Sequence, residues 1–186
     1  QTSALPKMEL LKEYFSDFFI LFKPRDVVSG DFYWFSHVEN QIIITVVDCT
    51  GHGVPGAFMS MLGMSLLKEI VVKEYITQPD IILRRMRKEV IRALGQTGSS
   101  GEQKDGMDIT VCSINTATLE MQWSGANIPC LIVKQGTMIR LKADKMPISI
   151  YDKMDKFTLN ELKLERNDII YLASDGFADQ FGGPEN

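Results

Sequence analysis

The sequence predicts a layered α/β domain whose sheets are mostly antiparallel. Two observations lead to this fold class. Strand-like segments occur both before and after a central pair of helices, and the later strands follow one another at hairpin spacing. Strands and helices do not alternate one by one, as they do in a parallel sheet with crossover helices. The length of 186 residues fits one domain or slightly more.

The first third of the chain is predicted to form a short helix followed by strands. Apolar residues at mixed helical spacing, with Pro6 near the start, predict a short helix or linker over residues 4–15. Three later segments have the aromatic and β-branched composition of strands: residues 17–22, 32–38 and 41–47. The joints between them are rich in turn residues, which predicts antiparallel neighbours.

Two helices occupy the middle of the chain. Pro55 suits the first turn of a helix, and residues 57–74 follow as a helix with one apolar stripe. This stripe and a run of methionines are predicted to fill the core: Phe58, Met61, Leu62, Leu66, Ile70 and Val71, with Met59 and Met64. A second helix covers residues 78–94, and its basic run 84–88 is predicted to be a solvated face.

Short strands fill the rest of the chain after a flexible loop at residues 95–106. Six segments have the strand period and are separated by turns: residues 109–114, 119–124, 129–134, 138–142, 157–164 and 169–173. A further helix could open at Phe177.

Composition and charge exclude several classes of function. The formal net charge of −4 argues against a nucleic-acid surface, which is usually a basic patch. Three widely spaced cysteines imply no disulfide framework and favour a reducing compartment. The longest uncharged apolar window, residues 54–67, is shorter than the about 20 residues of a membrane span. We therefore expect a cytoplasmic domain without nucleic-acid or membrane contacts.

Three aspartates stand where predicted strands meet turns: Asp31, Asp48 and Asp175. Carboxylates gathered in one place repel one another unless a cation neutralises them. Oxygen-only ligands favour Mg²⁺ or Mn²⁺ over zinc, and two such ions can bind a phosphate and activate water. The spacing alone does not bring the three together, and each also fits an ordinary turn or strand end.

A dinucleotide site is the main rival interpretation. Gly51, Gly53 and Gly56 satisfy the pattern GxGxxG after a strand and before a helix. Asp48 would repel a pyrophosphate there, and a second helix follows where an acid-tipped strand is expected. A cysteine-based phosphatase is excluded, because no cysteine is followed by an arginine six positions later.

Five separated segments together resemble one family: KPRDVVSGDFYW, DCTGHGVPGAFMSMLG, DGMDITVCSIN, WSGANIP and YLASDGFAD. They resemble the SpoIIE/RsbU-like branch of the metal-dependent (PPM-type) serine/threonine protein phosphatases, from about Phe22 to the C-terminus. The resemblance implies a central antiparallel β-sandwich flanked by helices. It also implies hydrolysis of phosphoserine or phosphothreonine by water that two Mn²⁺ or Mg²⁺ ions activate in the complete domain.

The resemblance also assigns roles to residues. Asp31 would be a metal ligand and Asp48 the bridging ligand, and both are therefore predicted catalytic residues. The backbone carbonyl of Cys49 and the carboxylate of Asp175 would be further ligands. Asp108 would add an outer metal or water contact, although it also fits an ordinary strand edge.

Three basic side chains have weaker assignments. His52 would donate a proton to the leaving serine oxygen, although a histidine in a loop is often only exposed or hydrogen-bonded. Lys23 or Arg25 could reach the substrate phosphate, although such side chains before a turn are usually solvated.

The resemblance finally implies an organisation and a partner. Residues 1–16 are expected to be an N-terminal helix or linker from an upstream sensory or helical region, and residues 17–186 the phosphatase domain, truncated at its C-terminus. The family's last acidic ligand lies in a C-terminal Asp-Asp motif, and this sequence contains no Asp-Asp pair. We therefore expect this chain to bind at most one ion tightly and to have weak activity.

The expected substrate is a phosphorylated regulatory protein of the anti-sigma-factor-antagonist type in bacterial signalling, and a homodimer is compatible with this organisation. A catalytically inactive, partner-binding module is the alternative.

Overall fold

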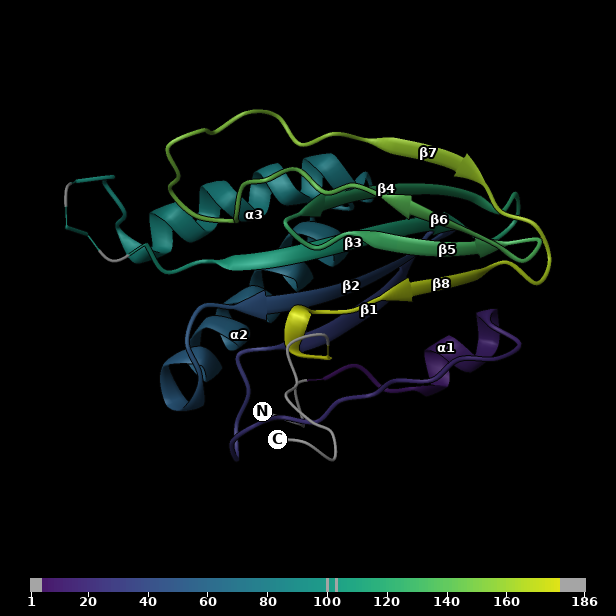
Figure 1. The fold of residues 1–186 in the computed structure, drawn as a ribbon, viewed down its shortest axis with the longest axis horizontal. Helices are drawn as coiled ribbons and strands as arrows, with labels where there is room; N and C mark the ends of the chain where they lie inside the picture. The colour runs from purple at the N-terminus through teal and green to yellow at the C-terminus, as the bar shows by residue number, and fades with distance from the viewer. Residues whose placement is uncertain (1–4, 100, 103, 178–186) are drawn as a thin grey trace, which may run out of the picture.

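Two antiparallel sheets form the centre of the molecule (Figure 1). The computed structural model describes residues 5–99, 101–102 and 104–177. The larger sheet has the strand order β1-β2-β3-β4-β7 and the smaller one the order β6-β5-β8. The strands of the larger sheet are β1 (Phe32–Val38), β2 (Gln41–Cys49), β3 (Met107–Asn115), β4 (Glu120–Ala126) and β7 (Asn160–Lys163). Those of the smaller sheet are β5 (Cys130–Lys134), β6 (Thr137–Leu141) and β8 (Ile169–Leu172).

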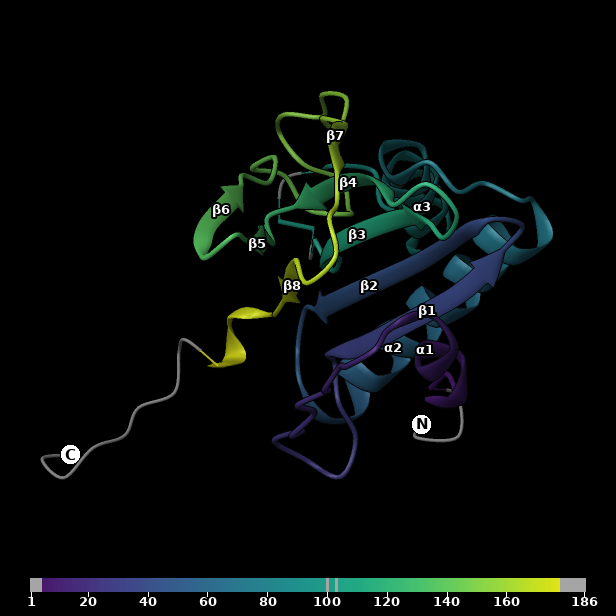
Figure 2. The same cartoon turned by 90° about the vertical axis from the view of Figure 1, so that its right-hand side faces the viewer.

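Helices cover the outer face of the larger sheet (Figures 1 and 2). The helical elements are α1 (Glu9–Tyr14), α2 (Gly53–Leu67), the π-helical η2 (Lys68–Lys73), α3 (Pro79–Leu94) and the 3₁₀ turn η3 (Asp175–Phe177). The smaller sheet packs against the other face of the larger one. The predicted fold class, a β-sandwich flanked by helices, is therefore confirmed.

The chain has two hydrophobic cores because side chains alternate between the faces of a strand. In β2, Ile43 and Val47 face the helices, whereas Ile42 and Ile44 face the smaller sheet. By the same alternation Asp48 belongs to the face that looks toward the smaller sheet. Leu11 of α1 is buried in the core between the sheets, so this short helix packs against the domain.

Two expectations from the sequence are wrong, one for residues 17–22 and one for part of α2. Residues 17–22 are irregular and do not form a strand. The predicted apolar stripe is wrong at Phe58 and Met61, which are 74% and 44% exposed, but its members Ile70 and Val71 are buried as predicted. Met59 and Met64 do fill the core, as predicted. The helix expected from Phe177 onward falls mostly outside the described residues.

The inner face of α2 carries small residues beside its buried methionines. A side chain on Gly63 would lie 2.8 Å from the ring of Phe32, so the helix and β1 approach closely there. Ser60 donates a hydrogen bond to the backbone carbonyl of Ser29 at 3.1 Å. Small residues thus let the helix pack directly against the segment that leads into β1.

The continuous helix Gly53–Lys73 is long and apolar enough to cross a membrane, by length and composition alone, with a mean hydropathy of 1.3. The uncharged window of residues 54–67 is shorter because the charged Lys68 follows it. Core helices of globular proteins share these properties, and Leu67, Ile70 and Val71 are fully buried here.

One arginine of the predicted solvated run is buried. Arg87 is 7% exposed and its guanidinium lies 4.6 Å from the ring centre of Phe157. It also donates to the backbone carbonyl of Asp155 at 2.7 Å. Arg87 therefore fastens the long connection between β6 and β7 onto α3, a role that a local charge pattern does not reveal.

Replacing Gly56 by alanine should destabilise the fold. The added methyl group would lie 2.6 Å from the carbonyl oxygen of Gly51 and 3.1 Å from the Cα of Gly30. We expect Gly56→Ala to lower the free energy of unfolding in urea by about 1–3 kcal/mol, despite the better helix propensity of alanine. Ser65→Ala, at an exposed position of the same helix, is the control and should change it by less than about 0.5 kcal/mol. A Gly56→Ala variant as stable as the wild type would contradict the close packing.

Candidate functional site

Three strand ends bring the predicted carboxylates to one end of the sandwich. Asp48 is near the end of β2, and Asp31 directly precedes β1. Because β1 and β2 are antiparallel, with Phe32 opposite Val47, the start of one lies beside the end of the other. Asp175 follows β8 and begins η3.

Asp48 is the centre of this carboxylate cluster. Its half-buried carboxyl group lies close enough to those of Asp175 and Asp31 for both to raise its pKa. Burial, followed by the neighbouring charges of Asp31 and Asp175, raises the pKa of Asp48 to about 8. The fold therefore brings together three aspartates that the spacing in the sequence left apart.

Neighbouring loops hold Asp31 in place. The hydroxyl of Ser174 donates to the carboxylate of Asp31 at 2.8 Å, which links the segments before β1 and after β8. A side chain on Gly30 would lie 2.8 Å from the carbonyl oxygen of Gly51 and 3.2 Å from that of Cys49. Only a glycine at position 30 lets the loop before β1 pack so closely on the loop after β2.

The side chain of Cys49 points away from the carboxylate cluster. The thiol is buried in the core under the helices, and burial, together with the charges of Asp48 and Asp31, raises its pKa above the usual range. A thiol in this state is a poor nucleophile. The predicted contribution of Cys49 is its backbone carbonyl, which lies on the side of Gly30, and its role as a ligand stays a prediction.

Asp108 lies directly across from Asp48 in the β2–β3 register. Burial raises the pKa of Asp108, and a hydrogen bond from the side chain of Asn127 at 2.8 Å opposes this shift. The nearby charge of Asp175 raises it further, and that of Lys145 lowers it. Asp108 is therefore a neighbour of the cluster, as its position in the motif suggested.

Asn127 is a residue that the sequence reasoning missed. It has a left-handed backbone with φ of 61°, which asparagine tolerates better than most residues. Its backbone N–H donates to the carbonyl of Asp144 at 2.9 Å, and this fixes the side chain that reaches Asp108. The segment WSGANIP was the available signal, but nothing in it identified the partner.

His52 lies on an exposed part of the loop between β2 and α2. Its Nδ1 is 3.3 Å from the carboxylate of Asp26, and among the contacts of the described residues none joins it to the three aspartates. Thr50 fixes the same loop from the other side, since its backbone N–H donates to the carbonyl of Gly106 at 3.0 Å. The structure therefore brings Asp31, Asp48, Asp108 and Asp175 together and leaves His52 at the rim.

The donor set of the cluster fits a hard divalent cation. It consists of carboxylate oxygens, which Mg²⁺ and Mn²⁺ prefer. A half-buried carboxyl group between two others needs either a proton or a cation, as the raised pKa of Asp48 indicates. Within the described ranges no three His, Cys, Asp or Glu side chains already surround one point as a compact metal cluster. The carboxylates are therefore neighbours, but they do not converge on a single point.

The glycine pattern of the loop does not form a nucleotide site. Gly56 packs against the carbonyl of Gly51 and the backbone of Gly30, so protein atoms fill the place of a phosphate. Both neighbours of β2 are antiparallel to it. A dinucleotide-binding fold requires parallel strands joined by a crossover helix, so this alternative is excluded.

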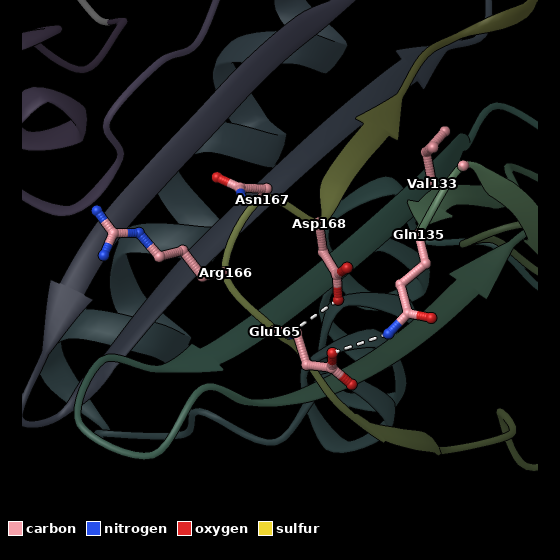
Figure 3. Close-up of a pocket in the computed structure, with 7 residues that line it drawn as sticks. Val133, Gln135, Glu165, Arg166, Asn167 and Asp168 are labelled. Carbon is pink, nitrogen blue, oxygen red and sulfur yellow. Dashed lines mark hydrogen bonds between the residues drawn. The ribbon is translucent and has the colours of Figure 1, made fainter.

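A separate pocket of about 290 Å³ lies at the far end of β8 (Figure 3). Its acidic residues are already paired: Lys134 is 2.9 Å from Glu165 and 3.7 Å from Asp168. Asp168 also accepts from the backbone N–H of Glu165 at 2.8 Å. These carboxylates are neutralised by the protein itself, in contrast to those around Asp48.

Two substitutions at position 127 test how Asp108 is held. Asn127→Gly removes the amide but suits the left-handed backbone, and we expect it to lower the free energy of unfolding by about 1–2 kcal/mol. Asn127→Ala loses the same hydrogen bond and adds backbone strain, so it should be about 1 kcal/mol less stable than Asn127→Gly. Equilibrium unfolding in urea measures both. Wild-type stability of Asn127→Gly would show that the hydrogen bond does not hold Asp108.

Comparison with solved structures places the chain among known phosphatase domains. The SiaA-PP2C domain of Pseudomonas aeruginosa is 30% identical, with a TM-score of 0.85 over 99% of this chain and 71% of that chain. The RsbU and RsbW domains of Rv1364c from Mycobacterium tuberculosis share 20% identity and a TM-score of 0.67, over 86% of this chain and 42% of that one. RsbX in complex with magnesium shares 17% identity and a TM-score of 0.61, over 84% and 71%.

Sequence comparison agrees with this placement. The family model described as Stage II sporulation protein E (SpoIIE) matches residues 39–186. No curated protein is similar enough in sequence to count as a relative. The resemblance carried by the five motifs is therefore confirmed by both the family model and the 30% identical SiaA domain. The chain belongs to the SpoIIE family, in the SpoIIE/RsbU-like branch of the metal-dependent (PPM-type) serine/threonine protein phosphatases.

Proposed function

We propose that this chain is a metal-dependent protein phosphatase that hydrolyses phosphoserine or phosphothreonine on a regulatory protein. One observation carries the proposal: the fold brings Asp31 and Asp175 close enough to Asp48, at one end of the sandwich, for both to raise its pKa. Family membership supports the reaction class.

Asp48 would be the central metal ligand, flanked by Asp31 and Asp175. The carbonyl of Cys49 would add a neutral oxygen, and Asp108 would contact the same site from the neighbouring strand. Divalent ions bound there would supply positive charge that binds a phosphate and lowers the pKa of water. Magnesium and manganese both suit this donor set, and RsbX, a related fold, was solved with magnesium.

The protein's own groups would orient these ligands. Ser174 holds Asp31 through a 2.8 Å hydrogen bond, and Asn127 holds Asp108 through another of the same length. Carboxylates that are already fixed would hold bound cations in place while negative charge develops on the phosphate, so the site would need no rearrangement.

His52 keeps a proposed role as proton donor to the leaving serine oxygen. Asp26 contacts its Nδ1, which leaves Nε2 as the nitrogen that would face a substrate. Its exposed place at the rim suits a group that meets the substrate after binding.

The proposed substrate is a phosphorylated regulator of the anti-sigma-factor-antagonist type. The related structure of Rv1364c contains an RsbU domain and an RsbW domain in one protein, which supports a regulatory setting of this kind. A catalytically inactive module that binds a partner is the second candidate, and the activity assay separates the two.

Replacing Asp48 by asparagine should abolish turnover. The central ligand loses its charge while the side chain keeps its shape, and several kcal/mol of transition-state stabilisation should be lost. We expect kcat on a phosphoprotein with Mn²⁺ to fall by about 10³-fold or more, and EDTA to remove the wild-type activity. Asp152→Asn is the control, because Asp152 is exposed and distant from the cluster in the sequence and in its contacts.

Full activity of Asp48→Asn, or wild-type activity that survives EDTA, would contradict the proposed mechanism. A wild type without activity on any phosphoprotein at saturating Mn²⁺ would instead favour the inactive module.

The specificity for a regulatory substrate is tested by comparing hydrolysis rates on different phosphorylated proteins and peptides. The wild type is incubated with several phosphorylated anti-sigma-factor antagonists and with unrelated phosphopeptides, and released phosphate is measured. We expect kcat/KM to be at least about tenfold higher for one antagonist than for the peptides, which corresponds to about 1.4 kcal/mol. Equal values throughout the panel would remove the claim of a specific regulatory substrate.

A further inference from the structure

The outer face of α2 is an exposed apolar surface that the proposed chemistry does not use. Val54, Phe58 and Met61 are spaced four and three residues apart, so they form one stripe on the helix. They are 64%, 74% and 44% exposed. We refer to these three residues as the α2 outer face. Contiguous exposed apolar residues indicate a contact surface, whereas scattered ones do not.

Large apolar residues lie on both faces of α2. A surface helix normally turns its large apolar residues toward the core. Here Met59, Met64 and Leu67 face the core in this way, but the three large residues of the α2 outer face do not. Core packing therefore does not account for the α2 outer face.

The α2 outer face begins beside the candidate site. Gly56 lies between Val54 and Phe58 in the sequence and packs on Gly30, the residue that precedes Asp31. The loop before β1 also reaches the start of the helix, because Asp26 contacts His52 at 3.3 Å. Val27 follows in this loop and is fully exposed. The α2 outer face therefore starts within one helical turn of Gly56, which packs on the loops that follow Asp48 and precede Asp31.

Basic residues lie in the same loop. Lys23 and Arg25 are exposed, and within the described part of the chain neither forms a salt bridge. Two positive charges at the edge of an apolar surface are complementary to a partner that carries a phosphate.

We propose that the α2 outer face, with Val27, is the docking surface for the phosphoprotein substrate. An apolar patch of the substrate would cover these residues, while Lys23 and Arg25 attract its phosphorylated segment toward the carboxylate cluster. This inference rests on the proposed function and adds to it the surface by which the substrate is recognised.

Phe58→Ser tests the docking surface with two substrates. One is the phosphorylated anti-sigma-factor antagonist that the wild type cleaves best, and the other is p-nitrophenyl phosphate, which has no protein surface that could dock. We expect KM for the phosphoprotein to rise at least about tenfold, as for loss of a buried aromatic anchor, with hydrolysis of p-nitrophenyl phosphate unchanged within twofold. Met138→Ser is the matched control, since Met138 is equally exposed but lies on β6.

A second variant tests the contribution of the basic residues Lys23 and Arg25 to docking. Lys23→Glu combined with Arg25→Glu should raise KM for the phosphoprotein and weaken its dependence on salt, because steering by opposite charge is screened by ions.

Three results would overturn the docking proposal. The first is an unchanged KM of Phe58→Ser for the phosphoprotein. The second is a drop in molar mass of Phe58→Ser by light scattering, which would assign the face to a second copy. The third is loss of wild-type binding to phosphatidylglycerol vesicles in Phe58→Ser, which would assign it to a membrane.

A binding experiment separates this proposal from the proposed activity. Calorimetry of a phosphorylated antagonist with Asp48→Asn, and with Asp48→Asn combined with Phe58→Ser, measures docking without turnover. We expect the second variant to bind at least about tenfold more weakly. Equal affinities would overturn the docking surface even if the wild type is an active phosphatase.

Discussion

Repulsion among three carboxylates is the constraint on which the site depends. Asp31, Asp48 and Asp175 would separate in a free chain, yet the fold holds them in contact at one end of the sandwich. The antiparallel register of β1 and β2 brings the first two together, and the end of β8 supplies the third. The energy of this arrangement comes from the two hydrophobic cores, and a bound cation would remove most of the repulsion.

The helix α2 connects this cluster to the rest of the molecule. Its small inner residues allow the loops that carry Asp31 and Asp48 to pack without a gap between them. Its large outer residues remain exposed beside the same loops. One helix thus packs against the ligand loops on one side, and on the other it carries the surface proposed to dock the substrate.

The sequence predicted the hairpins and both long helices because their signals are local. Strand alternation, Pro55 and Gly95 act over a few residues. The orientation of α2 was harder to predict. This helix is apolar on all sides, so the spacing of its apolar residues does not indicate that Phe58 faces outward. The contact of Asp48 with Asp175 and the buried position of Arg87 depend on segments far apart in the chain. The motifs identified the carboxylates, but only the fold revealed Asn127 as the partner of Asp108.

Thermal unfolding with and without Mn²⁺ tests most directly whether the carboxylate cluster is a metal site. At a metal concentration about 100 times the Kd, binding adds about 2.7 kcal/mol and should raise the wild-type Tm by about 5–10 °C. Asp48→Asn should show no such rise. Without metal it should be at least as stable as the wild type, because one repelling charge is gone. Equal metal-induced shifts in both proteins, or none in the wild type, would contradict the account.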